Sequence, residues 1–328
     1  MSCIDWRRDY LSYDAITLEN RELRVMVFPE LGGRIWSIVY KPLNREILWH
    51  NPHVQPQQVP FGSAFDDVWC GGWEEMFPTA APGTVNQKPF PDHGEVWCLP
   101  WTARVEESPG AVTLRLHCQA PLSGATVGKC FCLREEGARL EVTYTLTNQS
   151  KDELPFMFAL HPAFAISGGE RIDFPEMSVD LEPSYLGSLE GVTAPFAWPI
   201  ALRDGKPLDL RTVCSTASKE VYFLYGYGYQ SGWCALTDPA AHLTAGFVFH
   251  PDVFRSCWVF ATYGGWRDYH VVLLEPCTSR PQQIEMALEK QRAIRLAPGA
   301  SWQTAVTFLA QEGLSSVSGM TSEGRFRE

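Results

Sequence analysis

The sequence predicts an all-β protein, arranged as a sandwich or a barrel. Short runs alternate apolar with polar residues, Gly, Pro and Asn separate the runs as hairpin turns would, and helical periodicity is nearly absent. No repeat and no low-complexity linker divides the 328 residues, and strands continue to about residue 310. We therefore expect one large domain over residues 1–312 and a polar, frayed tail over residues 313–328.

The amino-terminal region is expected to contain three short strands, over residues 16–20, 23–28 and 34–40. A charged turn follows the first strand, and the breaker PELGG precedes the third. Arg34 comes directly after the two glycines of this breaker, so it could lie at the mouth of a strand; a solvated arginine is the alternative. Residues 51–60 are rich in Pro and Gln and are typical of an extended loop.

Residues 66–101, the Trp-rich segment, contain too many breakers for a regular helix or a long strand and predict an ordered loop system. Flat aromatic faces beside carboxylates and an imidazole suit a sugar, which has one face of C–H bonds and a rim of hydroxyls. A hydrophobic plug of loop tryptophans with solvated acids is the alternative. The residues concerned are Trp69, Trp73, Trp97, Glu74, Glu75, Asp92 and His93.

Beyond this segment the alternation of apolar and polar residues returns. Four strands are expected over residues 102–107, 111–120, 126–136 and 138–150. The last is the clearest, because every second residue from Leu140 to Leu146 is apolar and the residues between them are polar. This pattern is typical of a half-buried antiparallel strand.

The run LPFMFALHPAF over residues 154–164 is apolar throughout its first half, which indicates a strand buried on both faces. An irregular region follows over residues 172–210, and residues 280–292 could form one short helix or an ordered connection. The remaining strands are expected over residues 220–228, 233–238, 242–250, 257–264, 269–276 and 302–310.

Charge and cysteine usage limit the possible partners. The formal net charge is −11 and the pI is near 5.3, so nucleic acid and anionic membrane surfaces are poor partners. No run of about 18 apolar residues and no apolar signal core appears, which makes the cytoplasm the expected location. The ten cysteines form no Cys-x-x-Cys pair and show no zinc-like spacing, so reduced thiols and no metal site are expected. The oligomeric state stays open.

Two apolar strands lead into a group that can transfer protons, and proline follows each. His161 precedes Pro162, which restricts the backbone to an extended conformation and aims the imidazole rigidly. An imidazole can take up and release a proton near neutral pH. Glu275 follows four aliphatic residues, where a buried carboxylate is costly unless it is paired or functional. The alternatives are a core histidine hydrogen-bonded to backbone and a structural salt bridge from Glu275 to Arg280 or another cation.

Other candidates are less distinct. His93 lies in PDHG beside Asp92, which could orient its ring. His250 also ends a strand in His-Pro, and nothing in the order of residues excludes it. No nucleophile elbow, Walker loop or dinucleotide fingerprint is present. A glycosidase carboxylate pair could be drawn from Glu74, Glu75, Asp92 and Glu275, but their separations cannot be read from sequence.

Taken together, several blocks resemble the aldose 1-epimerase (galactose mutarotase-like) superfamily over about residues 15–310, as a divergent branch. The blocks are LRVMVFPELGGRIWSI, GGWEEMFP, PDHGEVWCLPW, LHPAF and LLEPCTSRP, and their order and spacing are more specific than any one of them. The resemblance implies a large twisted antiparallel β-sandwich that interconverts the α and β anomers of an aldose without cofactor or metal.

By this resemblance Glu275 is the general base, His161 is the general acid and His93 assists at the ring oxygen and hydroxyls. The family's His-Pro block precedes the middle of the chain, which favours His161 over His250. Trp73 and Trp97 could stack on the sugar, and the hydroxyls could be bound by Asp92, Glu74 and Arg34.

The substrate loops of the typical galactose enzyme are not evident, so the sugar stays open. A phosphorylated or sulfonated sugar would need clustered cations, which Arg34, Arg267 and Arg280 could supply. Two rival functions remain: a non-catalytic sugar-binding or sensor protein on the same scaffold, and a glycoside hydrolase or lyase.

Overall fold

The computed structural model describes residues 3–328, with side chains from residue 10 onward, and these residues are almost entirely antiparallel β-structure. The all-β prediction is therefore confirmed. The chain divides into two compact units. The first runs to Pro162 and includes Thr278–Thr307, and the second comprises Ala163–Cys277 and Phe308–Glu328.

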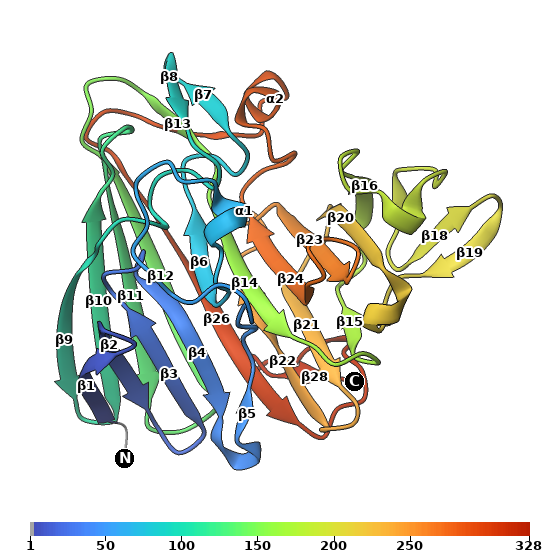
Figure 1. The fold of residues 1–328 in the computed structure, drawn as a ribbon, viewed down its shortest axis with the longest axis horizontal. Helices are drawn as coiled ribbons and strands as arrows, with labels where there is room; N and C mark the ends of the chain where they lie inside the picture. Colours follow the sequence, from blue (N-terminus) through green and yellow to red (C-terminus); the bar gives the residue numbers. More distant parts are fainter. Residues whose placement is uncertain (1–2) are drawn as a thin grey trace. The chain divides into compact units, whose positions relative to one another are not determined.

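One layer of the first unit has the strand order β1-β2-β3-β4-β6-β14, with a short β5 beside β4 (Figure 1). The strands predicted over residues 23–28 and 34–40 are β3 and β4. The bounds of the strands in this layer are β1 (Cys3–Tyr10), β2 (Tyr13–Glu19), β3 (Leu23–Phe28), β4 (Arg34–Tyr40), β5 (Arg45–Glu46), β6 (Trp73–Met76) and β14 (Ala159–Ala165), of which residues 159–162 of β14 belong to this unit. Strand β1 was not predicted, because its residues show no apolar alternation.

The second layer of this unit has the order β26-β12-β11-β10-β9. Alternation predicts its inner face correctly: Leu140, Val142, Tyr144 and Leu146 are all fully buried. The bounds are β9 (Thr102–Ser108), β10 (Ala111–Gln119), β11 (Ala125–Arg134), β12 (Arg139–Asn148) and β26 (Ser301–Glu312), of which residues 301–307 belong to this unit.

Short elements complete the first unit. The Trp-rich segment holds the one-turn helix α1 (Phe65–Val68) at its start, then β6 and the hairpin of β7 (Gly83–Val85) and β8 (Lys88–Phe90). The charged stretch after residue 280 contains the helix α2 (Ile284–Glu289), and a 3-10 turn spans Lys41–Leu43. A further pair joins β13 (Leu154–Phe156) to β25 (Ile294–Leu296).

The run predicted as one strand over residues 154–164 is instead divided into β13 and β14. The amides between the two strands have other partners. The Met157 N–H donates to the Pro78 carbonyl at 2.9 Å, and the Phe158 N–H donates to Thr278 Oγ1 at 2.9 Å. The prediction of burial on both faces is confirmed, because every residue from Leu154 to Phe164 is buried.

The second unit also contains two sets of strands, in the orders β24-β23-β20-β16-β17 and β15-β21-β22. Its long strands coincide closely with the predicted ones, and the region predicted as irregular holds several short strands and a 3-10 turn, Gly187–Leu189. The bounds are β15 (Arg171–Asp173), β16 (Ser178–Leu181), β17 (Phe196–Ala197), β18 (Ile200–Arg203), β19 (Lys206–Asp209), β20 (Glu220–Tyr227), β21 (Gly232–Asp238), β22 (Leu243–Phe249), β23 (Ser256–Tyr263) and β24 (His270–Cys277).

Residues 313–328, for which we expected a frayed tail, form the small hairpin of β27 (Gly319–Met320) and β28 (Phe326–Arg327). Val317 and Phe326 are buried in one apolar cluster with Trp233 of the same unit. A second 3-10 turn, Thr216–Ser218, precedes β20. Cys3 lies outside the residues whose side chains are described, and the nine cysteines from Cys70 to Cys277 are free thiols.

Candidate active site

The centre of the site is Glu74 on β6, which is fully buried and binds two partners. Arg34 donates from Nη1 to Glu74 Oε2 at 2.5 Å. His161 Nδ1 lies 3.0 Å from Glu74 Oε1, because His161 on β14 pairs directly opposite Glu74 on β6. Arg34 and His161 are themselves only 4% and 7% exposed, so the three side chains form one desolvated cluster.

The glycines of the GGWEE block bring the chain close enough to form this cluster. Gly71 has φ +91°, and a Cβ placed on it would lie 2.2 Å from the Trp49 carbonyl oxygen. Its own carbonyl accepts a second hydrogen bond from Arg34 Nη1 at 2.6 Å. Gly72 has φ +85°, and a Cβ there would meet the Ile35 carbonyl oxygen at 2.7 Å. Only glycine combines this backbone conformation with these approaches.

The charges of the cluster follow from burial and pairing. Burial opposes ionisation of Glu74, but the Arg34 guanidinium and the His161 hydrogen bond outweigh it and lower the pKa of the carboxyl. Burial is also the largest influence on His161 and lowers the pKa of its imidazole, with Glu74 acting against it. Because Glu74 is ionised, we assign the Nδ1–H of His161 as its donor, which leaves Nε2 to bind or release a proton.

A second imidazole lies beside the first. The ring centroids of His93 and His161 are 4.8 Å apart and nearly perpendicular. Asp92 Oδ1 lies 3.1 Å from His93 Nδ1. Burial works against ionisation of Asp92, but its hydrogen bonds with His93 prevail and lower the pKa of that carboxyl. The sequence-predicted residues Arg34, Glu74, Asp92, His93 and His161 are thus neighbours in the first unit.

Phe65 of α1 is the aromatic centre of this neighbourhood and was not among the residues predicted from sequence. Its ring stacks on His93 with centroids 3.5 Å apart and contacts His161 edge-on at 5.3 Å. Trp97 meets Phe65 edge-on at 5.0 Å and donates from Nε1 to the Asp92 carbonyl. Trp69 contacts His161 at 5.4 Å. Loop residues without periodicity gave no signal for Phe65.

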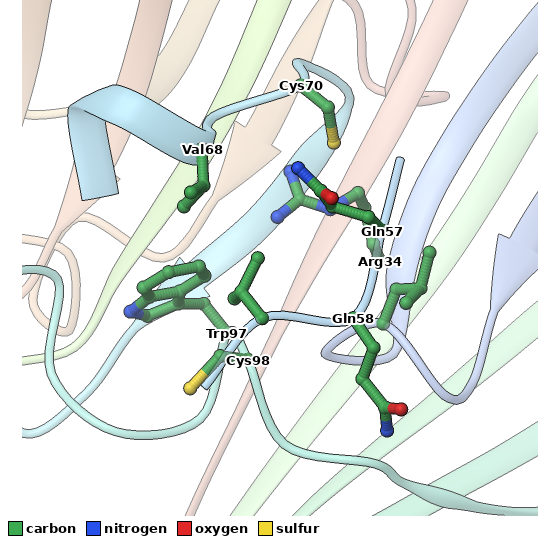
Figure 2. Close-up of a pocket in the computed structure, with 9 residues that line it drawn as sticks. Arg34, Gln57, Gln58, Val68, Cys70, Trp97 and Cys98 are labelled. Carbon is green, nitrogen blue, oxygen red and sulfur yellow. The ribbon is translucent and has the colours of Figure 1, made fainter. Parts of the chain in front are cut away.

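A pocket opens beside Arg34 and Trp97 (Figure 2). Figure 2 shows the side chain of Gln57 lying beside the Arg34 guanidinium, with Val68 and Trp97 on another wall. Arg34 Nε is buried and has no hydrogen-bond partner among the described residues. The lining residues are Leu31, Arg34, Gln57, Gln58, Val59, Val68, Cys70, Trp97 and Cys98. Arg34, the one Lys or Arg among these lining residues, is already paired with Glu74.

Two residues of the GGWEE block lie elsewhere. Trp73 and Glu75 alternate with Glu74 along β6 and lie on the other side of the strand, in the core of the first unit. Trp73 is fully buried there. Glu75 accepts a hydrogen bond from Tyr144 at 2.8 Å and pairs with Lys129, which the sequence analysis also missed. The signal for Lys129 was its place among alternating apolar residues of β11.

Glu275 and His250 belong to the second unit. Glu275 lies in β24 opposite Trp258 of β23 and is only 2% exposed. His250 follows β22 in an open turn, where its side chain is 63% exposed and lies 3.8 Å from Asp252. Of the other candidate cations, Arg267 packs over Trp266 in a turn of the second unit, whereas Arg280 belongs to the first.

The comparisons with known proteins agree with the architecture. Residues 5–91 match the family model described as a domain of unknown function, DUF5107. A galactose mutarotase-like protein from Clostridium acetobutylicum is 12% identical, with a TM-score of 0.66 over 95% of this chain and 99% of that chain. A galactose mutarotase-like protein from Lactobacillus casei ATCC 334 is 18% identical, with a TM-score of 0.60 over 90% of this chain and 100% of that chain. A galactose mutarotase related enzyme from Lactobacillus acidophilus is 14% identical, with a TM-score of 0.60 over 93% of this chain and 99% of that chain.

The chain therefore has the galactose mutarotase-like fold, and the resemblance found in its sequence is confirmed at the level of the fold. Among residues 3–328, no helix has the length and apolar character needed to cross a membrane. The described residues contain no group of three or more His, Cys, Asp or Glu side chains placed to hold a metal ion.

Proposed function

We propose that this protein is a mutarotase, an isomerase that interconverts the α and β anomers of a small free aldose. In this proposal His161 exchanges a proton with the ring oxygen, and Glu275, whose role rests on the family resemblance alone, exchanges a proton with the anomeric hydroxyl. The observation that supports this most directly is the His161–Glu74–Arg34 cluster on a mutarotase-like fold. It holds an imidazole rigidly by one nitrogen and leaves the other for proton transfer.

The chemistry balances without any further reactant. Glu275 removes the proton of the anomeric hydroxyl, the electron pair forms the C1=O bond, and the C1–O5 bond breaks. O5 takes the proton from Nε2 of the His161 imidazolium. Rotation about C1–C2 turns the other face of the aldehyde toward O5. On closure O5 attacks C1 and returns its proton to His161 Nε2, while Glu275 gives its proton to the anomeric oxygen.

Glu74 sets the state of His161 in this scheme. Burial prevails and lowers the pKa of the imidazole, whereas the ionised carboxylate acts against it and favours the imidazolium. The two influences oppose one another, which suits a group that must both give and accept a proton at one pH. His93 lies near enough to assist at a neighbouring hydroxyl, with Asp92 fixing its ring.

The substrate we propose is a neutral aldose. The Arg34 charge is compensated by Glu74, and the pocket beside it adds the amides of Gln57 and Gln58, Trp97 and two thiols. Amides recognise hydroxyls, and Trp97 offers an apolar surface for C–H groups. A phosphate or sulfonate would find no uncompensated arginine in this pocket.

Polarimetry or NMR of freshly dissolved α-anomers tests the function across a panel of neutral, phosphorylated and sulfonated aldoses. The protein is expected to speed equilibration of at least one neutral sugar over buffer. His161→Asn and Glu275→Gln should each lower the catalysed rate by about 10²- to 10⁴-fold. If no sugar equilibrates faster with protein than without it, the proposal is wrong.

His250→Asn is the matched control, because it changes the other His-Pro histidine at an exposed turn. It should leave the rate unchanged. A sugar that binds in calorimetry without faster equilibration would assign the sugar-binding function in place of the isomerase. Parental activity in both His161→Asn and Glu275→Gln would refute the residue assignment even if the activity itself is present.

A further inference from the structure

A second ionisable cluster, Lys129–Glu75–Tyr144, lies in the core of the first unit, and the proposed chemistry does not use it. Lys129 of β11 and Glu75 of β6 pair inside the core, and their side chains are 0% and 1% exposed. Tyr144 of β12, opposite Lys129 in the strand register, donates to Glu75 Oε1 at 2.8 Å. The Lys129 ammonium also lies 4.7 Å from the centre of the Trp101 ring.

Lys129 contacts two residues that are sequence neighbours of candidate active-site residues. Its Nζ donates to the Gly33 carbonyl at 2.9 Å, and Gly33 is the residue before Arg34. Its carboxylate partner Glu75 is the residue after Glu74. One buried cation thus connects the start of β4 to the middle of β6.

This connection matters because β4 and β6 are joined by little backbone pairing. Among the described residues, the register between the two strands rests on one pair, Ile35 opposite Trp73. Longer ladders fix neighbouring strands elsewhere in the unit, such as β11 against β12. The Arg34–Glu74 contact is made across the sparsely paired junction.

We infer that Lys129 is a positioning residue for the active site, acting through the backbone from the core. By binding the Gly33 carbonyl and the Glu75 carboxylate, it sets the spacing of β4 and β6 at which Arg34 and Glu74 meet. Glu74 in turn orients the His161 imidazole. Stability alone does not account for such a pair, because an apolar pair of similar volume often serves a core equally well. Only the kinetic test of this inference depends on the proposed function, and the titration of His161 does not.

The test is the double variant Lys129→Met/Glu75→Leu, which replaces the pair by apolar side chains and leaves no buried charge. The matched control is Arg134→Met/Glu141→Leu, which removes an exposed ion pair between β11 and β12, where the Arg134 Nε and Glu141 Oε1 atoms lie 3.4 Å apart. The core variant, Lys129→Met/Glu75→Leu, should unfold at a lower urea concentration than the parent, because the Gly33 carbonyl and the Tyr144 hydroxyl lose these partners. The control should unfold close to the parent. Nitrogen-15 NMR of the His161 ring and mutarotation kinetics are then compared.

In the core variant the hydrogen bond between Glu74 and the His161 ring should weaken, so the pKa of His161 should fall. The value of kcat should drop about 10- to 100-fold, with a smaller change in KM. The control should match the parent in both. A folded core variant with parental His161 titration and parental kcat would overturn the inference. If the apolar pair does not fold, Lys129→Met/Glu75→Gln provides the same comparison with a polar residue in place of the carboxylate.

The two readouts separate this inference from the proposed function. If the parent itself does not equilibrate any sugar, the proposed function fails, and the His161 titration still decides whether Lys129 positions the cluster. If the parent is active and the core variant keeps both parental readouts, only the positioning role fails.

Discussion

Glu74 and Glu75 are adjacent in sequence, equally buried and each paired with a cation, yet their carboxyls differ in protonation behaviour. Burial raises the pKa of both, but at Glu74 the Arg34 guanidinium and the His161 hydrogen bond prevail, so its pKa is lowered. At Glu75 burial prevails over Lys129 and the Tyr144 hydroxyl, so its pKa is raised. The environment on each side of β6, rather than the residue type, decides which carboxylate can serve an active site.

The partners explain the difference. Arg34 presents a planar fork and His161 can itself become cationic, so two potential positive charges converge on Glu74. Glu75 has one compact ammonium and a neutral phenol, and Lys129 shares its donors with the Gly33 carbonyl. Substituting one partner at a time tests whether these partners cause the difference between the two carboxyls.

Removing the cationic partner of Glu75 should have the largest effect on stability. Lys129→Met leaves a fully buried carboxyl beside Tyr144 alone, and such single removals cost about 3–5 kcal/mol of unfolding free energy. Urea unfolding measures the loss. Arg134→Met, which breaks an exposed pair on the same strand, should cost about 0–1 kcal/mol. A loss for Lys129→Met as small as that of Arg134→Met would contradict the assigned burial of the pair.

The difference between the two glutamates also shows what the sequence could reveal. Alternation in β12 predicts its buried residues, and the same alternation places Lys129 inward with Val127 and Phe131. An inward lysine signals a buried partner, but nothing in the sequence identifies that partner. From sequence, Glu74 and Glu75 are a pair of carboxylates within a predicted loop system. Because β6 has only four residues, its alternation is too short to assign their faces from sequence.

The two His-Pro histidines make the same point. His161 and His250 each follow an apolar run and precede proline, and only the family resemblance favoured the first. In the structure His161 lies within β14, hydrogen-bonded to Glu74, whereas His250 is exposed in a turn. Pairing with β6 makes the difference, and this pairing joins residues 87 positions apart. Local sequence cannot report such a contact.

The close approach that builds the Glu74 side can be tested by Gly71→Ala. The left-handed backbone itself costs an alanine about 1–2 kcal/mol, and the control Gly62→Ala has that cost alone, since nothing lies within 4 Å of a Cβ there. At Gly71 the methyl group would also collide with the Trp49 carbonyl, which should add about 1–3 kcal/mol. Thermal or urea unfolding of both variants measures the difference. Equal losses would show that the approach to Trp49 is looser than the structure indicates.

The two carboxyls should also give opposite pH dependences of stability. At Glu74 the unfolded chain holds more protons, so its contribution is complete above the unfolded pKa and is lost as the pH falls through the lowered folded pKa. At Glu75 the folded chain holds more protons, so its contribution is complete below the unfolded pKa and is lost as the pH rises through the raised folded pKa.

Glu74→Gln should therefore remove a rise of stability with pH, and Glu75→Gln should remove a fall. Urea unfolding at steps between about pH 2.5 and 8 compares the slopes, which are insensitive to any constant loss from the substitution itself. Slopes that change in the same direction in both variants would refute the opposite environments assigned to the two side chains.

The smallest effect is expected for Tyr144→Phe, which separates the hydrogen bond of Glu75 from its charge pairing. The variant removes one hydroxyl from a fully buried site. Lys129 still contacts the Glu75 carboxylate and the Gly33 carbonyl, so the loss of stability should be about 1 kcal/mol. Because Lys129, and not Tyr144, makes the hydrogen bond described at the Gly33 carbonyl, the pKa of His161 and the mutarotation rate should stay at parental values. If Tyr144→Phe moved the His161 titration as strongly as loss of Lys129, the coupling across β6 would depend on the charge state of Glu75 rather than on the position of the Gly33 backbone.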